Sequence, residues 1–197
     1  IQKEIGDSTL GGRDIWLDEN IGRLNTDKQG RYLGSFNTDE SIMVIYEDGS
    51  YEFTDFELTN RYKLNEIEII EKFNPKYIIT AVHFDGGSRN YYIKRFQIET
   101  TTIGRRFGFI SEERASKLVL ISIGDNPILE YNYRTKRGEK KSRIETIVDF
   151  VEVKGWKAMG NKLGRFLRMS GFKWLEENEQ KSELLEEKDK TELTLFN

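Results

Sequence analysis

The highest density of positive charge lies in ten residues, Arg134 to Arg143, which contain six cations and one acid. The segment reads Arg134-Thr-Lys136-Arg137-Gly-Glu-Lys140-Lys141-Ser-Arg143, and its glycine indicates an exposed loop. Lysine supplies a point charge and arginine a forked set of donors, and both groups pair with phosphate oxygens. The segment therefore predicts contact with a polyanion such as nucleic acid.

A second basic stretch, residues 153–165, has four cations, three glycines and no acid. Glycine lets a backbone approach a phosphate closely and present its N–H donors. No base-reading motif is evident, so we expect phosphate contact with little direct sequence readout. Two cationic pairs, Lys94-Arg95 and Arg105-Arg106, are outlying candidates, for which ordinary solvated surface is the alternative. The residues predicted to contact DNA are Arg134, Lys136, Arg137, Lys140, Lys141, Arg143, Lys154, Gly155, Lys157, Gly160, Lys162, Arg165, Lys94, Arg95, Arg105 and Arg106.

These cations stand out because the chain as a whole is acidic, with a formal net charge of −3. Residues 134–173 hold 12 Lys and Arg against 4 Asp and Glu, whereas residues 174–197 hold 3 against 8. Such an uneven distribution suggests a localised contact with a polyanion. The acidic segment could compete with DNA for the basic face, although we interpret it as a solvated tail.

The residue types needed for catalysis are sparse. His83, the single histidine, lies in an apolar run, so we interpret it as a strand residue and not as the base of a triad. The chain has no cysteine, no Gly-x-x-x-x-Gly-Lys-Ser/Thr loop and no His-Glu-x-x-His motif. Glu66, Glu68 and Glu71 resemble the exposed positions of a strand edge more than a catalytic pair. We therefore predict no catalytic residue, metal site or cofactor in this chain; an undetected hydrolase that uses His83 is the minor alternative.

Short apolar runs separated by turn signals must position the basic residues. These runs cover 42–46, 78–82, 91–93 and 118–121, and none up to residue 150 keeps a helical period. The 12 Phe, 9 Tyr and 3 Trp also favour strands. No run reaches the roughly 18 apolar residues of a membrane helix, and the first residues lack a signal-peptide layout. With no cysteine, the chain fits the reducing cytoplasm, close to the nucleoid if it binds DNA.

Turn signals recur at a spacing close to 40 residues. Asp48-Gly49, Asp85-Gly86 and Gly124-Asp125 each lie between two apolar runs, 37 and then 39 residues apart. Asp-Gly is typical of tight hairpins because glycine accepts positive φ. With a weaker copy at residues 15–24, the spacing predicts three to four blades of an all-β fold over residues 1–168. A charged, flexible or partly helical tail is expected at 169–197, and an irregular β-sandwich is the alternative fold.

Five short motifs, in order along the chain, resemble the C-terminal domain of the A subunit of bacterial type IIA topoisomerases, in the topoisomerase IV and gyrase form found in Bacteroidetes-type bacteria. The resemblance covers residues 5–168. It rests on Thr9-Leu-Gly-Gly-Arg-Asp-Ile-Trp-Leu-Asp18, Gly30-Arg-Tyr-Leu-Gly34, Ile70-Glu-Lys-Phe73, Tyr92-Ile-Lys-Arg-Phe96 and Val153-Lys-Gly-Trp-Lys-Ala-Met-Gly-Asn-Lys-Leu163.

The resemblance implies a β-pinwheel, a propeller-like ring or arc whose basic rim bends duplex DNA. It implies that the chain is a non-catalytic piece of a longer ATP-dependent enzyme, whose partners are the A-subunit dimer and the B subunit. Mg²⁺ and ATP would be bound through the B subunit. The number of blades implied by the family exceeds what this chain can hold, so we expect the later part of the domain as an open arc.

One departure from the family bears on activity. The gyrase hallmark Gln-Arg-Arg-Gly-Gly-Lys-Gly is absent, and its nearest counterpart is Lys154-Gly-Trp-Lys-Ala-Met-Gly160. This substitution suits relaxation and decatenation more than negative supercoiling. A protein-interaction platform, which propeller-like folds also provide, is the alternative function, with Trp16, Tyr32 or Trp174 as docking aromatics.

Overall fold

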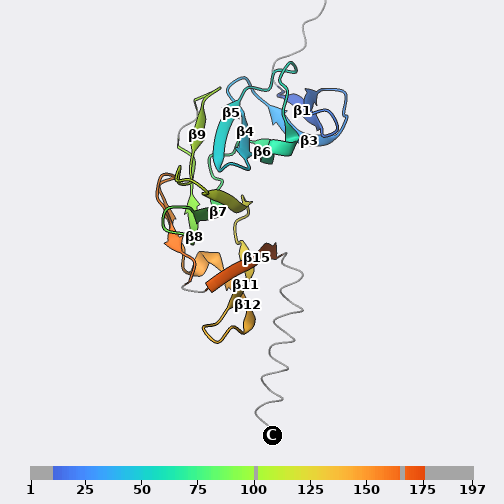
Figure 1. Ribbon diagram of the computed structural model, residues 1–197. Helices are drawn as coiled ribbons and strands as arrows, with labels where there is room; N and C mark the ends of the chain where they lie inside the picture. The colour runs from blue at the N-terminus through green and yellow to red at the C-terminus, as the bar shows by residue number, and fades with distance from the viewer. Residues whose placement is uncertain (1–10, 100–101, 165–166, 176–197) are drawn as a thin grey trace, which may run out of the picture.

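The computed structural model describes residues 11–99, 102–164 and 167–175, and within them the chain forms four small β-sheets. The sheets follow one another along an arc, with β1 at one end and β11, β12 and β15 at the other (Figure 1). Two single 3-10 turns, η1 (Leu64–Glu66) and η2 (Ile147–Asp149), are the helical elements of the described residues. None of the described residues forms a helix long and apolar enough to cross a membrane.

The first two sheets are built from the first half of the chain. The first sheet has the order β2-β1-β3, from β2 (Arg23–Asn25), β1 (Arg13–Asp18) and β3 (Arg31–Phe36). The second has the order β6-β4-β5-β9, from β6 (Ile67–Lys72), β4 (Ile42–Tyr46), β5 (Ser50–Thr54) and β9 (Arg106–Gly108).

The third and fourth sheets use the remaining strands. The third has the order β10-β7-β8-β13, with β14 also paired to β8; its strands are β10 (Lys117–Ser122), β7 (Ile79–Asp85), β8 (Asn90–Phe96), β13 (Val153–Lys154) and β14 (Asn161–Lys162). The fourth has the order β12-β11-β15, from β12 (Lys140–Thr146), β11 (Ile128–Arg134) and β15 (Leu167–Leu175).

Strand exchange links the second, third and fourth sheets. β9 follows the β7–β8 hairpin in the chain but returns to pair with β5 of the second sheet. In the same way, β13 and β14 follow the β11–β12 hairpin but pair with β8 of the third sheet. We call these returning segments the first strap (residues 103–109) and the second strap (residues 153–162). Each strap first runs parallel to its host strand, then turns and runs antiparallel.

Three hydrophobic cores are each shared by neighbouring sheets. Along β4, Ile42 and Val44 join the first core, while Met43 and Ile45 join the second. Successive side chains of a strand point to opposite faces, so a strand between two cores must be apolar at every position. This requirement explains the unbroken apolar run 42–46. The sheets are therefore stacked on three separate cores and not around a single central one.

The predicted all-β, blade-repeat fold is confirmed, as are the hairpins predicted at the two Asp-Gly turns. Asp48-Gly49 joins β4 to β5 with Gly49 at φ +77°, and Asp85-Gly86 begins the turn from β7 to β8. The weaker copy at residues 15–24 forms the β1–β2 hairpin. The third hairpin prediction is wrong: Gly124-Asp125 connects β10 of the third sheet to β11 of the fourth. A local turn signal fixes the chain's reversal but not which strands pair.

The predicted boundary at residue 168 is also wrong, because β15 pairs with β11 through Leu175. Trp174 lies opposite Leu129, and its indole N–H donates to the carbonyl of Ile121 at 3.0 Å. The last aromatic residues therefore belong to the fourth sheet and not to a tail. The rest of the predicted tail, residues 176–197, lies outside the described residues.

Candidate nucleic-acid interface

The second strap holds five of the predicted DNA contacts, of which three are lysines. β13 pairs in parallel with β8 through Val153 and Lys154, and β14 pairs antiparallel with β8 through Asn161 and Lys162. Between them, residues 155–160 form the strap loop, closed by a hydrogen bond of 2.9 Å from the Ala158 N–H to the Gly155 carbonyl. The side chains of Lys154, Lys157 and Lys162 are all exposed. The second strap thus presents three exposed lysines, one on its loop and one on each of the two strands that fix the loop to β8.

Lys94 lies beneath this loop and not on the surface, with 3% of its area exposed. Its ammonium donates to the carbonyls of Trp156 at 2.7 Å and Ala158 at 2.8 Å, and also to the carbonyl of Phe109. Burial lowers the pKa of Lys94 to about 8, so the group still carries its proton at neutral pH.

Two more contacts attach the second strap to the third sheet. His83 is fully buried on β7, and its Nε2 lies 2.8 Å from the carbonyl of Met159. Burial is the main cause that lowers the pKa of His83, which favours the neutral ring at neutral pH. Trp156 packs edge-on against Tyr51, with ring centroids 5.7 Å apart, and so joins the second core.

The prediction that Lys94 and Arg95 contact DNA is therefore wrong. Arg95 is 8% exposed, and its Nη1 donates to the carbonyl of Val151 at 3.2 Å. β8 is covered on both faces, so neighbouring side chains that point in opposite directions are both buried. Both cations bind backbone carbonyls of the chain itself, and neither is available to a phosphate.

The two glycines predicted to admit a phosphate differ from each other. Gly160 has φ +96°, and a Cβ there would lie 2.4 Å from the carbonyl oxygen of Ile93. Gly155 has no atom within 4 Å of such a Cβ. Gly160 is thus required by close packing of the strap on β8, whereas the structure places no comparable demand on Gly155.

The β11–β12 hairpin carries the second predicted group. Its two strands pair from Ile128 opposite Thr146 to Arg134 opposite Lys140, so the cations line the far end of the hairpin and its tip. Arg134 donates to the carbonyl of Gly138 at 2.9 Å, and Arg143 lies 2.5 Å from a carboxylate oxygen of Glu145. All six predicted cations are exposed; they are Arg134, Lys136, Arg137, Lys140, Lys141 and Arg143.

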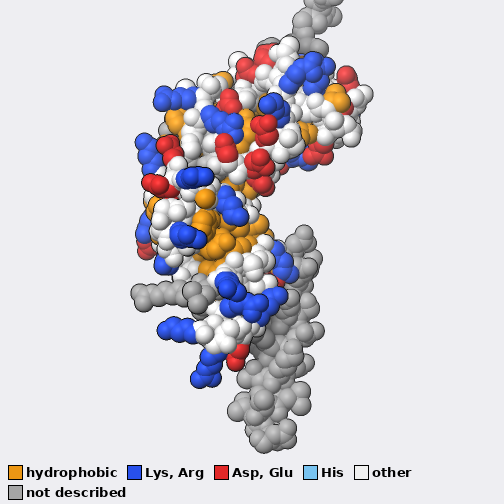
Figure 2. Space-filling view, in the orientation of Figure 1, with side chains coloured by type: hydrophobic (Ala, Val, Ile, Leu, Met, Phe, Trp, Pro, Cys, Tyr) orange, Lys and Arg blue, Asp and Glu red, His pale blue; other side chains and the backbone are white. Residues whose placement is uncertain are grey.

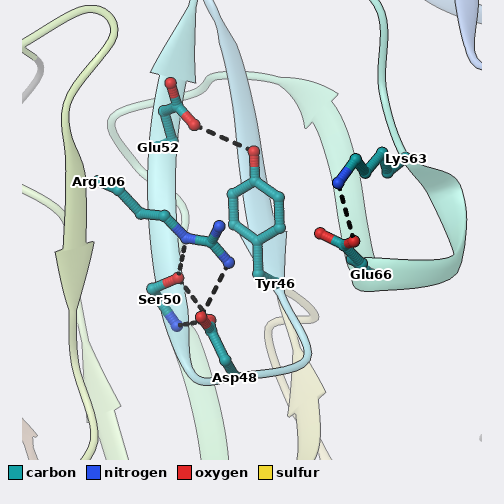
Figure 3. A network of polar contacts seen from close by, with 7 residues as sticks. All are labelled: Tyr46, Asp48, Ser50, Glu52, Lys63, Glu66 and Arg106. Atoms are coloured by element: carbon teal, nitrogen blue, oxygen red, sulfur yellow. Dashed lines mark hydrogen bonds and ion pairs between the residues drawn. The ribbon is translucent and has the colours of Figure 1, made fainter.

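The first strap presents its cations differently. The Arg106 guanidinium lies 3.6 Å from the centre of the Tyr46 ring, donates to Ser50 Oγ at 2.6 Å and pairs with Asp48 at 2.9 Å (Figure 3). Tyr46 in turn donates to Glu52 at 3.0 Å, and burial is the main cause that raises the pKa of Tyr46 to about 12. Arg106 is exposed but bound, which argues against its predicted role in DNA contact.

Arg105 remains a candidate, because it is exposed and its guanidinium lies 5.0 Å from the centre of the Phe107 ring. Arg165 lies outside the described residues.

Two of the exposed cations outside the predicted set are Arg168, which adjoins the basic hairpin, and Arg89. Arg168 lines a cavity of about 290 Å³ together with Arg134 and Lys140, and it also lines a neighbouring cavity with Arg89. Both Arg89 and Arg168 have positive φ, at 56° and 52°. Arg89 lies in the β7–β8 turn, and Arg168 was placed at the supposed end of the domain. The available signal was their position beside glycine-rich turns, which favour exposed loops.

The charges are unevenly spread over the molecule (Figure 2). Acidic side chains gather over the half that contains β1 to β6, whereas the part around β11, β12 and β15 shows mostly Lys and Arg. Such separation creates a local positive potential on a chain of negative net charge.

Comparison with known proteins identifies a family for this chain. The chain matches the family described as "Topoisomerase C-terminal domain, Bacteroidota" over residues 23–166. No curated protein matches it. A solved structure entitled "Crystal structure of the C-terminal domain of DNA topoisomerase IV" is similar, with a TM-score of 0.49 and 8% identity, over 85% of this chain and 64% of that one. The chain therefore belongs to the Bacteroidota family of topoisomerase C-terminal domains.

Proposed function

We propose that this domain binds duplex DNA through the exposed cations of the second strap and the β11–β12 hairpin. The observation that carries the proposal is the exposure of Lys154, Lys157 and Lys162 on the second strap, which pairs with β8 at both ends, together with six more exposed cations on a hairpin of the fourth sheet. Because these groups meet phosphates and not base edges, we expect affinity with little sequence preference.

The arc of the sheets supports a second element of the proposal, that the DNA is bent. Cations spread over two adjacent sheets of a curved array can follow a duplex only if the duplex curves with them, and added contacts offset the cost of bending. Family membership supports a role as the non-catalytic part of a topoisomerase A subunit, which presents duplex DNA for strand passage. In that role its partners would be the A-subunit dimer and the B subunit, and the B subunit would supply ATP and Mg²⁺ binding.

The test is binding of the 197-residue chain to a linear duplex of about 40 base pairs, followed by fluorescence anisotropy across a salt series. We expect binding that weakens steeply with salt, with a slope that reports the number of phosphates neutralised. Affinity that stays flat between low and physiological salt would exclude the mechanism. Absence of binding at low salt would favour the alternative, a docking platform for a partner protein.

A further inference from the structure

We propose that Lys94 is a positioning residue whose buried ammonium fixes the strap loop, residues 155–160, in the conformation that presents Lys157 to a phosphate. This inference rests on the proposed DNA binding for its function but not for its structural part. The family match assigns no role to any residue inside the domain, and Lys94 is buried beneath the strap loop, so it does not itself meet DNA.

The geometry of the ammonium carries the proposal. Its acceptors come from two different straps: Phe109 ends the first strap, while Trp156 and Ala158 belong to the second. One side chain on β8 therefore ties together segments that are 47 and 49 residues apart in the sequence. An ammonium has three donors, and all three are used.

The apolar surroundings of Lys94 raise the free-energy cost of losing these hydrogen bonds. The ammonium lies 5.1 Å from the ring centre of Phe96 and 5.8 Å from that of Phe109, and Lys94 is 3% exposed. The bond to the Phe109 carbonyl is buried and those to Trp156 and Ala158 are part-buried, so carbonyls that lose this donor would pay a desolvation penalty. The titratable and charged groups around the site are His83 and Asp85 of β7, Arg106 and Glu112 of the first-strap region, and Lys157 of the loop.

The link to function is preorganisation of the loop. The backbone carbonyls of residues 156, 158 and 159 point inward to Lys94 and His83, so the exposed Lys157 is held on the outer side. Its ammonium lies 5.0 Å from the ring centre of Trp156, which is itself anchored in the second core. A cation held in place loses less conformational entropy when it meets a phosphate than a cation on a mobile loop.

The test uses the absence of cysteine in this chain, which makes a Lys94→Cys substitution a unique site for alkylation. The variant is alkylated while unfolded and then refolded. Aminoethylation restores an ammonium at nearly the length of lysine, whereas carbamidomethylation leaves a neutral side chain of similar size. Lys117→Cys, an exposed lysine of β10, is treated in the same two ways as the matched control.

Two measurements are made on each form: amide hydrogen exchange of residues 155–160, and affinity for the duplex of about 40 base pairs. We expect the carbamidomethyl form at position 94 to exchange these amides about tenfold faster and to bind DNA about tenfold more weakly, and the aminoethyl form to recover both. Exchange in the β4–β5 hairpin serves as the check on global folding. If the carbamidomethyl form does not fold, Lys94→Met, which fills the same space, replaces it in the comparison.

Equal exchange of residues 155–160 in the two alkylated forms would overturn the proposal. If the unmodified chain binds no DNA but exchange still depends on the ammonium, the proposed function fails while the anchoring role stands. If every form binds DNA normally and exchange does not change, the proposed DNA binding stands while the anchoring role of Lys94 fails. A loss of DNA affinity that aminoethylation does not rescue, while the amides of residues 155–160 stay protected, would also count against the role of Lys94.

Discussion

The two straps have the same topology but use their cations in opposite ways. Each enters parallel to the second strand of a hairpin, turns, and leaves antiparallel. On the first strap, Arg106 reaches back to Tyr46, Ser50 and Asp48, so the strap's own cation attaches it. On the second, the attaching cation is Lys94 of the host strand, and the strap's lysines stay exposed.

The difference shows that a cation on a strap does not by itself indicate a ligand. What matters is whether the strap's own cation is used to attach the strap to its sheet. Lys94 binds both straps, but on the first strap Arg106 is also held by the host hairpin, whereas the lysines of the second strap are available to solvent and to phosphate. The predictions below test this contrast, from the largest expected effect to the smallest.

Gly160→Ala should have the largest effect. A methyl group would meet the Ile93 carbonyl oxygen at 2.4 Å, on a residue whose φ of +96° already disfavours alanine. We expect a loss of about 3 kcal/mol in the free energy of unfolding, from backbone strain and overpacking combined. Urea denaturation measures the loss. Gly155→Ala is the matched control and should change stability by less than about 0.5 kcal/mol; similar losses in both variants would contradict the assigned packing role.

Charge reversal of the exposed strap lysines should affect binding and not folding. For Lys154→Glu with Lys157→Glu we expect duplex affinity to fall about 100-fold and the salt slope to fall by about 2. The control is Lys63→Glu with Lys76→Glu, two exposed lysines of the acidic half, which changes the net charge equally. Equal losses in the two double variants would mean that only net charge matters, and the strap would have no special part.

Arg106→Ala should weaken the fold more than DNA binding. It removes the contact with the Tyr46 ring, the bond to Ser50 and a half-exposed ion pair with Asp48, so we expect a loss of about 1–2 kcal/mol in unfolding free energy. The neighbouring Arg105→Ala should do the opposite, with near-normal stability and a salt slope lower by about 1. Calorimetry measures the stability of both variants, and fluorescence anisotropy measures their DNA affinity. A tenfold loss of affinity in an Arg106→Ala protein of normal stability would refute the assigned structural role of Arg106.

The smallest expected effect is a pH dependence due to Lys94. Burial lowers the pKa of Lys94 to about 8 in the folded chain, against an ordinary value of 10.5, so between these values the unfolded chain binds more protons. The unfolding free energy of the unmodified chain should therefore rise relative to Lys94→Met above pH 8, by about 1 kcal/mol at pH 9. Below pH 8 the difference should be constant. Urea denaturation of both proteins at pH 7, 8 and 9 measures it, and a pH-independent difference would contradict the assigned burial.

The local features of the fold could be predicted from the sequence. Asp48-Gly49 and Asp85-Gly86 mark true hairpins because the turn residue and both apolar runs are close together in the chain. Gly124-Asp125 has the same appearance, yet its flanking strands pair elsewhere. Strand exchange could not be predicted, because pairing of β8 with residues 153–162 depends on packing over long sequence separations.

The exposed cations of the candidate site could also be predicted, but the buried ones could not. Lys94 and Arg95 were grouped with surface pairs because two adjacent cations usually lie on a solvated face. A signal was present in the flanking Ile93 and Phe96, both fully buried, which indicate a strand covered on both faces. What the sequence does not show is the set of carbonyls that makes burial of a charge tolerable.

Strand exchange also has a consequence for the order in which the chain folds. As the chain leaves the ribosome, β5 has an open edge until β9 has been made, and β8 has one until residues 153–162 have followed. The second and third sheets are thus each completed only after the hairpin of the next sheet exists, which gives high contact order and couples folding of neighbours. In repeat proteins that stack as separate units, the last unit can be removed without disrupting the others. Here, removal of the last sheet together with residues 153–162 would also remove strands of the third sheet. A chain truncated before residue 153 would leave one edge of β8 unpaired, and an unpaired apolar edge favours aggregation.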